Sequence, residues 1–188
     1  MIKSINKLNI AIKSCTLCML SQNRINAVPG TGNIQSNIML IGEAPGKNED
    51  QIGMPFTGTS GKYLDKLLSI ASLNRELVFI TNLVKCKPPS NRDPLLDEIT
   101  ACSTYLNEQI NIIKPKLIIT LGRYSLKNWM PRETISNVHG TYKKIDNFIL
   151  VPMYHPAAAM YRGSLRKIIE NDYVELGKFI NTTNRIGI

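Results

Sequence analysis

The chain has 188 residues, of which 43% are hydrophobic and 20% are charged, and this is the composition of a globular protein. Its length suits one domain with its own core, over residues 1–188, and no apolar run is long enough to cross a bilayer. The start of the chain mixes lysine and asparagine into its apolar residues, unlike a secretion signal, so we expect a cytoplasmic protein with no membrane partner.

Basic residues outnumber acidic ones by 23 to 14, which gives a net charge of +9. Acidic residues are absent before Glu43 and from position 109 to 132, so positive charge is concentrated in those stretches. Such an excess favours a polyanionic partner, although a surplus that only keeps the protein soluble is the alternative.

The first half of the chain predicts two helices and two strands. Apolar residues from Ile2 to Ile12 have helical spacing, and so do those of residues 60–71, with Ser60 as a possible N-cap. Residues 37–42 and 77–82 are short apolar runs that read as buried strands.

The second half continues the alternation. Residues 93–113 predict a helix with Asp93 as cap and Pro94 at its first position, and residues 164–180 predict another. Between them, residues 116–122 and 148–155 read as strands. Apolar strands that alternate with helices favour a parallel sheet covered on both faces.

Special residues follow each predicted strand. They are Gly42 and Glu43, then Asn82, then Gly122 and Arg123, and finally His155. Because ligands of open α/β sheets bind at the carboxyl ends of the strands, we expect the functional site there.

Four cysteines form a C-x2-C pair, Cys15 and Cys18, and a C-x15-C pair, Cys86 and Cys102. Without an export signal, a metal site is favoured over disulfides. Zinc ribbons usually use two tight pairs, whereas a cubane iron–sulfur cluster tolerates scattered thiolates. Iron–sulfur, zinc and free thiols all stay open on spacing alone.

Five stretches occur in order: "GEAPGKNEDQIGMPFTGTSG" from Gly42, "TNLVKCKPPSNRDP" from Thr81, "EITACSTYLNEQI" from Glu98, "KPKLIITLGR" from Lys114 and "HPAAAMYR" from His155. Together with the cysteines they resemble family 4 uracil-DNA glycosylases, the iron–sulfur branch of that superfamily. The resemblance implies a three-layer α/β/α sandwich with a four-stranded parallel sheet. It also implies a [4Fe-4S] cluster on the four cysteines, in a monomer that acts on uracil-containing DNA.

The resemblance also assigns roles. Phe56 would stack on uracil, Asn82 would read its N3–H and O4 edge, and the His155 imidazole would stabilise negative charge on O2. The glycines of the first turn allow close approach of the nucleotide, which places the backbone of Gly42, Ala44 and Gly46 at the base. The better-known branch has an aspartate where Ala44 stands.

Two acids are candidates for handling water, Glu43 and Glu49, and either could instead exclude the thymine methyl group. Asp50 is interpreted as the cap of a local turn and His139 as a surface residue. DNA contacts are expected from a larger set: Ser60, Met160, Tyr161, Arg162, Arg166 and Lys167. Which of Met160 and Tyr161 fills the gap left by the flipped base stays open.

With no lysine convincingly beside these motifs, we expect release of free uracil without strand cleavage. The main alternative is a non-enzymatic nucleic-acid-binding protein with a structural metal. A nucleotide hydrolase is disfavoured, because the glycine-rich turn matches no phosphate-binding motif. A sliding clamp is a candidate protein partner.

Overall fold

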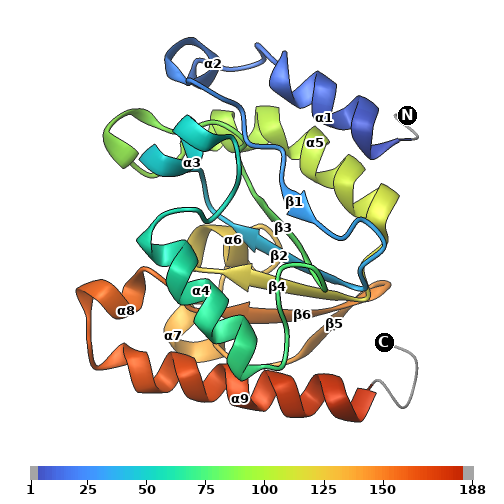
Figure 1. The fold of residues 1–188 in the computed structure, drawn as a ribbon, viewed down its shortest axis with the longest axis vertical. Coiled ribbons are helices and arrows are strands. Elements are labelled where there is room, and N and C mark those ends of the chain that lie inside the picture. The colour runs from blue at the N-terminus through green and yellow to red at the C-terminus, as the bar shows by residue number, and fades with distance from the viewer. Residues whose placement is uncertain (1–3, 184–188) are drawn as a thin grey trace.

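The computed structural model describes residues 4–183, and a six-stranded sheet with the order β1-β3-β2-β4-β6-β5 forms its centre (Figure 1). The inner strands are parallel to one another, namely β3 (Phe79–Asn82), β2 (Ile38–Gly42), β4 (Leu117–Leu121) and β6 (Phe148–Met153). Their apolar runs are buried because helices cover both faces of the sheet. The predicted α/β/α sandwich and its four parallel strands are therefore confirmed.

The prediction that the sheet has only four strands is wrong, because an antiparallel strand borders each edge. The strand β1 (Thr31–Gly32) pairs with β3, and β5 (Lys143–Ile145) pairs with β6. These segments of two and three residues are largely exposed and carry no apolar run. Only their pairing with a neighbour defines them as strands, so the hydrophobic pattern does not reveal them.

The helices form two layers (Figure 1). On one face, α1 (Ile5–Lys13) packs against α5 (Leu96–Ile113), and on the other α4 (Thr59–Ile70) packs against α9 (Leu165–Thr183). Successive strand residues serve opposite layers: Leu40 belongs to the core under α4 and α9, and Ile41 to the core under α1 and α5. The sheet thus joins two separate cores.

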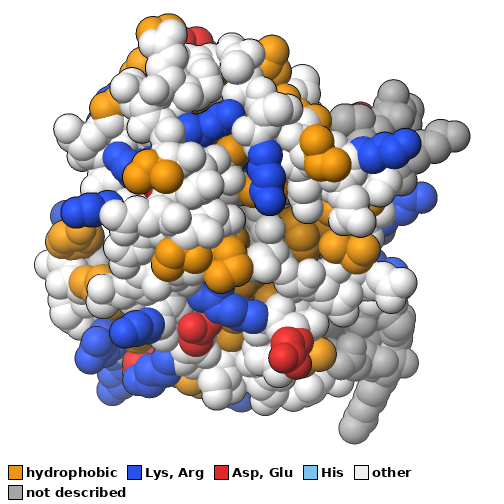
Figure 2. All heavy atoms as spheres, turned by 45° about the horizontal axis from the view of Figure 1, so that its top comes forward, with side chains coloured by type: hydrophobic (Ala, Val, Ile, Leu, Met, Phe, Trp, Pro, Cys, Tyr) orange, Lys and Arg blue, Asp and Glu red, His pale blue; other side chains and the backbone are white. Residues whose placement is uncertain are grey.

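Shorter helices connect these elements: α2 (Leu20–Asn23), α3 (Lys47–Ile52), the 3-10 turn η1 (Pro89–Asn91), α6 (Arg123–Lys127), α7 (Ile135–Val138) and α8 (Ala158–Tyr161). Basic side chains are more prominent than acidic ones on the face drawn in Figure 2, in line with the net charge of +9. No helix in the described part of the chain has the length and apolar character needed to cross a membrane.

Two predicted helix starts are wrong. The helix α4 has Gly58 at its N-cap, which places Ser60 in the first turn. The helix α5 begins after Leu95, whose N–H donates to the Glu98 carboxylate at 2.8 Å, whereas Asp93 binds Arg123 and Tyr124. Of the predicted first helix, Ile2 lies outside the described residues.

His139 is not the free surface residue that the sequence suggested. Its Nδ1 lies 2.7 Å from the Asp172 carboxylate on α9, and its ring centroid lies 4.8 Å from that of Tyr154. The side chain is only 25% exposed. His139 therefore links the end of α7 to the C-terminal helix, a contact that no local pattern predicts.

Candidate active site

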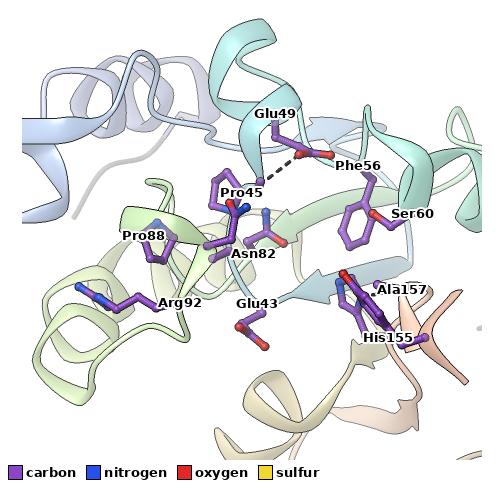
Figure 3. Close-up of a pocket in the computed structure, with 14 residues that line it drawn as sticks. Glu43, Pro45, Glu49, Phe56, Ser60, Asn82, Pro88, Arg92, His155 and Ala157 are labelled. Carbon is purple, nitrogen blue, oxygen red and sulfur yellow. Dashed lines mark hydrogen bonds between the residues drawn. The ribbon is translucent and has the colours of Figure 1, made fainter. Parts of the chain in front are cut away.

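A pocket of about 370 Å³ opens at the carboxyl ends of β2 and β3 and beside the loop that follows β6. Most of the predicted site residues line it: Glu43, Ala44, Gly46, Glu49, Phe56, Ser60, Asn82, His155 and Tyr161. Figure 3 shows Glu43 and Asn82 beside the ends of their strands, with the side chains of Glu49, Phe56, Ser60 and His155 around the same pocket. The pocket thus lies where a parallel sheet is expected to hold its ligand.

Other lining residues were not singled out from the sequence, namely Pro45, Pro88, Asn91, Arg92 and Ala157. Arg92 is the most polar of them, and its guanidinium forms two hydrogen bonds with the Glu98 carboxylate, at 2.8 and 2.6 Å. The segment "PPSNRDP" lies inside a stretch that carries the family resemblance, and that position was the signal by which Pro88, Asn91 and Arg92 could have been found.

Phe56 is held in an unusual backbone conformation, with φ of +54°. The Arg75 guanidinium, paired with Asp65 at 2.6 Å, donates to the carbonyls of Pro55 and Phe56 at 3.1 and 2.5 Å. The first turn of α4 packs so closely that a Cβ on Gly61 would lie 1.8 Å from the Phe56 oxygen. These contacts hold the Phe56 ring at the pocket.

Asn82 ends β3 and is only 2% exposed. Within residues 4–183 its side-chain amide has no hydrogen-bond partner, although a buried amide ordinarily has one. A Cβ on Gly42 would lie 2.3 Å from its Oδ1 and 2.8 Å from the Phe56 ring. Glycine at position 42 is therefore what allows the amide and the ring to occupy their places.

His155 lines the same pocket, and its ring centroid lies 5.6 Å from that of Phe56. Burial lowers the pKa of His155 to about 4, against a smaller opposite effect of Glu49, so the imidazole is neutral at pH 7. The Ala157 N–H donates to Nδ1 at 3.2 Å. From that hydrogen bond we assign the remaining proton to Nε2, which makes Nε2 the free donor.

The two candidate acids have different surroundings, as Figure 3 shows. Glu49 is 8% exposed, and its carboxylate accepts the backbone N–H groups of Gly46, Thr57 and Gly58 at 2.9 to 3.1 Å. Those hydrogen bonds connect the loop after β2 to the loop before α4. Glu49 is therefore a structural clamp at the pocket wall.

Glu43 follows β2 directly, and among the described residues its carboxylate has no hydrogen-bond or salt-bridge partner. Burial raises the pKa of Glu43 to about 7; Asp93 adds to this rise and Arg123 opposes it. A carboxylate with this pKa can exchange a proton near neutral pH. Of the two acids, Glu43 is therefore the one whose carboxylate has no partner among the described residues.

Asp50 does not cap a local turn. Its carboxylate is buried and accepts the backbone N–H groups of Ile25 and Asn26 at 2.9 and 3.2 Å. The acid next to Glu49 thus ties the N-terminal segment to α3.

The rim of the pocket carries the predicted DNA contacts. On α8, Tyr161 is 87% exposed and lines the pocket, whereas Met160 is 43% exposed and does not line it. Arg162, with Tyr161, borders a second depression of about 440 Å³ beside Glu43 and His155. Further along, Arg166 and Lys167 are exposed at the start of α9, with the Arg166 guanidinium 5.4 Å from the centre of the Tyr63 ring.

The four cysteines line one small cavity between α1 and α5, on the other side of the sheet from α4 and α9. Among the described residues, no three His, Cys, Asp or Glu side chains stand close enough together to hold one metal ion. Nitrogen donors do face the sulfurs: the Arg24 guanidinium lies 2.9 Å from Cys86 Sγ, and the Lys85 backbone N–H lies 3.3 Å from Cys102 Sγ. Burial raises the pKa of both thiols, to about 11 for Cys102, and these donors oppose that rise.

Comparison with known proteins identifies the family. The model of the Uracil DNA glycosylase superfamily matches residues 29–175. The type-4 uracil-DNA glycosylase of Sulfurisphaera tokodaii is 47% identical, over 98% of this chain and 89% of that protein. Those of Saccharolobus solfataricus and Archaeoglobus fulgidus are 50% and 41% identical, over 86% and 89% of this chain and 80% and 88% of theirs. The chain therefore belongs to the uracil-DNA glycosylase superfamily, among its type-4 members.

Proposed function

We propose that this protein removes uracil from DNA and leaves an abasic site, as a monofunctional glycosylase in base excision repair. The observation that supports this most directly is the unpaired amide of Asn82 in the wall of the pocket, beside Phe56. The amide faces the open pocket and no protein group uses it, so its donor and its acceptor are both free to bind a ligand.

Uracil matches the groups around the pocket. The Asn82 amide can accept from N3–H and donate to O4, and the Phe56 ring can stack on the base. Cytosine presents the opposite pattern, with an acceptor at N3 and a donor on the exocyclic amine. The pocket therefore favours uracil, and the base must leave the stack to enter it.

Cleavage of the bond between base and sugar needs groups that stabilise the charges that develop in the transition state. When the bond between the sugar C1′ and uracil N1 breaks, the electron pair goes to uracil, where it reaches O2. The Nε2–H of His155 is the donor that stabilises this negative charge. A neutral histidine suffices for that role, since it needs only a hydrogen bond.

We assign the role of general base to Glu43. Its ionised carboxylate stabilises positive charge on the sugar and orients a water, which adds to C1′ and gives its proton to the carboxylate. The Glu49 carboxylate already accepts three backbone N–H groups, so Glu49 holds the pocket loops in place instead. The uracil anion leaves and takes up a proton from solvent.

DNA would lie across the rim, where Ser60, Met160, Tyr161, Arg162, Arg166 and Lys167 are candidates for contacts with the sugar–phosphate chain and the gap. No lysine of the described chain lines the pocket, which supports release of the base without strand cleavage. A monomeric state, a sliding-clamp partner and a cytoplasmic location stay predictions.

The cysteine site fits a [4Fe-4S] cluster by its donor chemistry. All four candidate ligands are thiols, and N–H groups face three of the sulfurs, those of Cys15, Cys86 and Cys102. A bound cluster would join the end of α1, the segment after β3 and α5, and its role here is to hold those segments together. The test is iron content and broad visible absorbance of the purified protein. Cys86→Ser should lose both and lower the melting temperature, whereas a colourless protein with one zinc would refute the cluster.

The activity is tested with oligonucleotides that carry one uracil, thymine or cytosine, followed by alkali and a sizing gel. Cleavage after alkali should appear only with uracil, and none should appear without alkali. A protein that binds the uracil strand but releases no base would instead support the non-enzymatic alternative.

A further inference from the structure

Lys85 is a buried lysine that the proposed chemistry does not use. Its side chain is 1% exposed, and its Nζ lies 2.7 Å from each of three oxygens, which belong to Thr81, Asn82 and Gln109. The Thr81 hydroxyl donates its own proton to the Pro29 carbonyl at 2.8 Å, so all three oxygens act as acceptors. Three donated protons require an ammonium, because a neutral amine has only two N–H bonds.

This ammonium has no carboxylate partner in the described part of the chain. A buried charge without a counter-charge is costly, and three neutral oxygens offset only part of that cost. An anion close to Lys85 would compensate the positive charge of its ammonium.

The nearest source of negative charge is the cysteine site. Lys85 directly precedes Cys86, its backbone N–H donates to Cys102 Sγ at 3.3 Å, and it lines the same small cavity as all four cysteines. Four thiolates around iron and sulfide form an anionic group. Lys85 therefore faces the cysteine site with its backbone N–H and holds the end of β3 with its side chain.

The end of β3 is where the base is read. The Lys85 ammonium binds the backbone carbonyl of Asn82, the residue whose side-chain amide faces the pocket. Gln109 fixes the network from α5, since its Nε2 also donates to the Pro29 carbonyl at 2.7 Å. The contact chain thus runs from the cysteine site through Lys85 to the proposed uracil-reading residue.

We propose that Lys85 is a positioning residue that couples the cysteine-bound cluster to the uracil-reading amide of Asn82. The inference rests on the proposed function. The Lys85 backbone N–H faces Cys102 Sγ, and its side chain fixes the backbone from which Asn82 reaches the base. The cysteine site then supports base recognition directly, in addition to holding the chain together.

The test compares Lys85→Met with Lys87→Met in the iron-loaded protein. Lys85→Met keeps the length of the stem and removes the charge and all three side-chain hydrogen bonds. Lys87→Met removes the same charge on the other side of Cys86, from a side chain outside this network. For each protein, kcat and KM for uracil release are measured, together with the reduction potential of the cluster by direct electrochemistry.

Lys85→Met should lower kcat roughly ten- to a hundredfold with little change in KM, because misplacement of a group at the base has that scale of effect. The cluster potential should also become more negative, because a nearby cation favours the reduced form. Both values should stay near wild type in Lys87→Met. If only one of the two readouts moves in Lys85→Met, or neither does, the coupling is overturned.

A second variant covers the case in which Lys85→Met does not fold or hold iron. Gln109→Met removes one of the three acceptors from a residue distant from Cys86 in the sequence, and it should lower kcat severalfold at full iron content. An unchanged kcat there overturns the inference. Wild-type protein that releases no uracil overturns the proposed function instead, and wild-type protein that holds no iron but releases uracil overturns the coupling alone.

Discussion

The base pocket and the cysteine site differ in how they treat polar groups. In the pocket, the Asn82 amide and the Glu43 carboxylate have no hydrogen-bond partner among the described residues. Beside the cysteines, the Lys85 ammonium makes three hydrogen bonds, and the Arg24 guanidinium contacts Cys86 Sγ and the carbonyls of Lys13 and Cys15.

This difference separates two uses of a polar side chain. A group that the protein leaves without a partner can give its hydrogen bonds to a substrate, at the expense of stability when no substrate is bound. A group with all its partners in the protein stabilises the fold and has no hydrogen bond left for a substrate. Changes to unpaired groups should therefore affect rate directly, whereas changes to paired groups should affect stability and reach the rate only where, as at Lys85, they hold a residue that contacts the base.

The strongest test of this contrast is Asn82→Asp. The aspartate keeps the shape of the side chain but loses the donor to uracil O4, and when ionised it repels that oxygen. Uracil release should fall by on the order of 10³-fold or more, because sites that read polar edges reject mismatched partners by 10⁴–10⁵. Weak cytosine release should appear, since the carboxylate can accept from the exocyclic amine.

Single-turnover rates on uracil and cytosine oligonucleotides measure this effect, and a circular-dichroism melt is the control. The variant should stay folded, because the amide has no protein partner to lose, with a melting temperature lowered only by the cost of burying a carboxyl group. A folded variant that removes uracil at the wild-type rate would place the base-reading site elsewhere.

Glu43→Gln should have the next largest effect, a loss of about 10²-fold in kcat/KM, as is typical for a general base. The pKa of Glu43 is raised to about 7, and the ionised form is the active one, so the wild-type kcat/KM should rise with pH up to about 7 and then level off. Since the pKa of His155 is lowered to about 4, His155 stays neutral throughout this range.

The pH profile of kcat/KM for both proteins checks this assignment. The inflection near pH 7 should disappear in Glu43→Gln. Its persistence in that variant would show that another group titrates and that Glu43 is not the base.

Glu49→Gln sharpens the comparison, because Glu49 lines the pocket but is fully paired. The amide cannot accept on both sides, so at least one of the backbone N–H groups of Gly46, Thr57 and Gly58 loses its partner. We expect a loss of roughly 1–3 kcal/mol in the free energy of unfolding, measured by chemical denaturation. Glu43→Gln is the matched control and should not lower the free energy of unfolding, because its carboxylate has no partner to lose and the amide removes a charge that burial disfavours. Equal stabilities for the two variants would contradict the division of roles.

The smallest effect is expected at the rim, from Tyr161→Ala compared with Met160→Ala. Tyr161 is 87% exposed and lines the pocket, whereas Met160 is 43% exposed and does not, so Tyr161 is the better candidate to fill the gap in a duplex. Its removal should slow uracil release from duplex DNA severalfold, with less effect on single strands, where stacking neighbours are fewer. A larger duplex defect in Met160→Ala would reverse the assignment.

The sequence predicts the inner sheet and the location of the pocket well, for a physical reason. Fully buried parallel strands such as residues 117–121 must be continuously apolar, and the chain must turn where they end. The positions of Asn82 and His155 at the pocket could be predicted because both follow such runs and carry the family resemblance. The edge strands escaped prediction because Thr31–Gly32 and Lys143–Ile145 are defined by pairing and not by burial.

The partners of individual polar groups could not be predicted. Glu49 and Glu43 look alike in the sequence, and what separates them is the placement of backbone N–H groups at positions 57 and 58, which depends on tertiary folding. Asp93 has the position of a helix cap, yet it pairs with Arg123 and Tyr124 from a later segment. Contacts over such sequence distances leave no local pattern.

The Glu49 clamp and the Arg75 contacts to the Phe56 loop also lower the entropic cost of binding DNA. Both hold their loops through hydrogen bonds within the protein, so the walls of the pocket are ordered before DNA arrives. The loss of loop freedom then occurs during folding and does not reduce the affinity for the extrahelical nucleotide. Ordering at the moment of binding is left to the DNA, which must give up base stacking and backbone freedom at a single nucleotide.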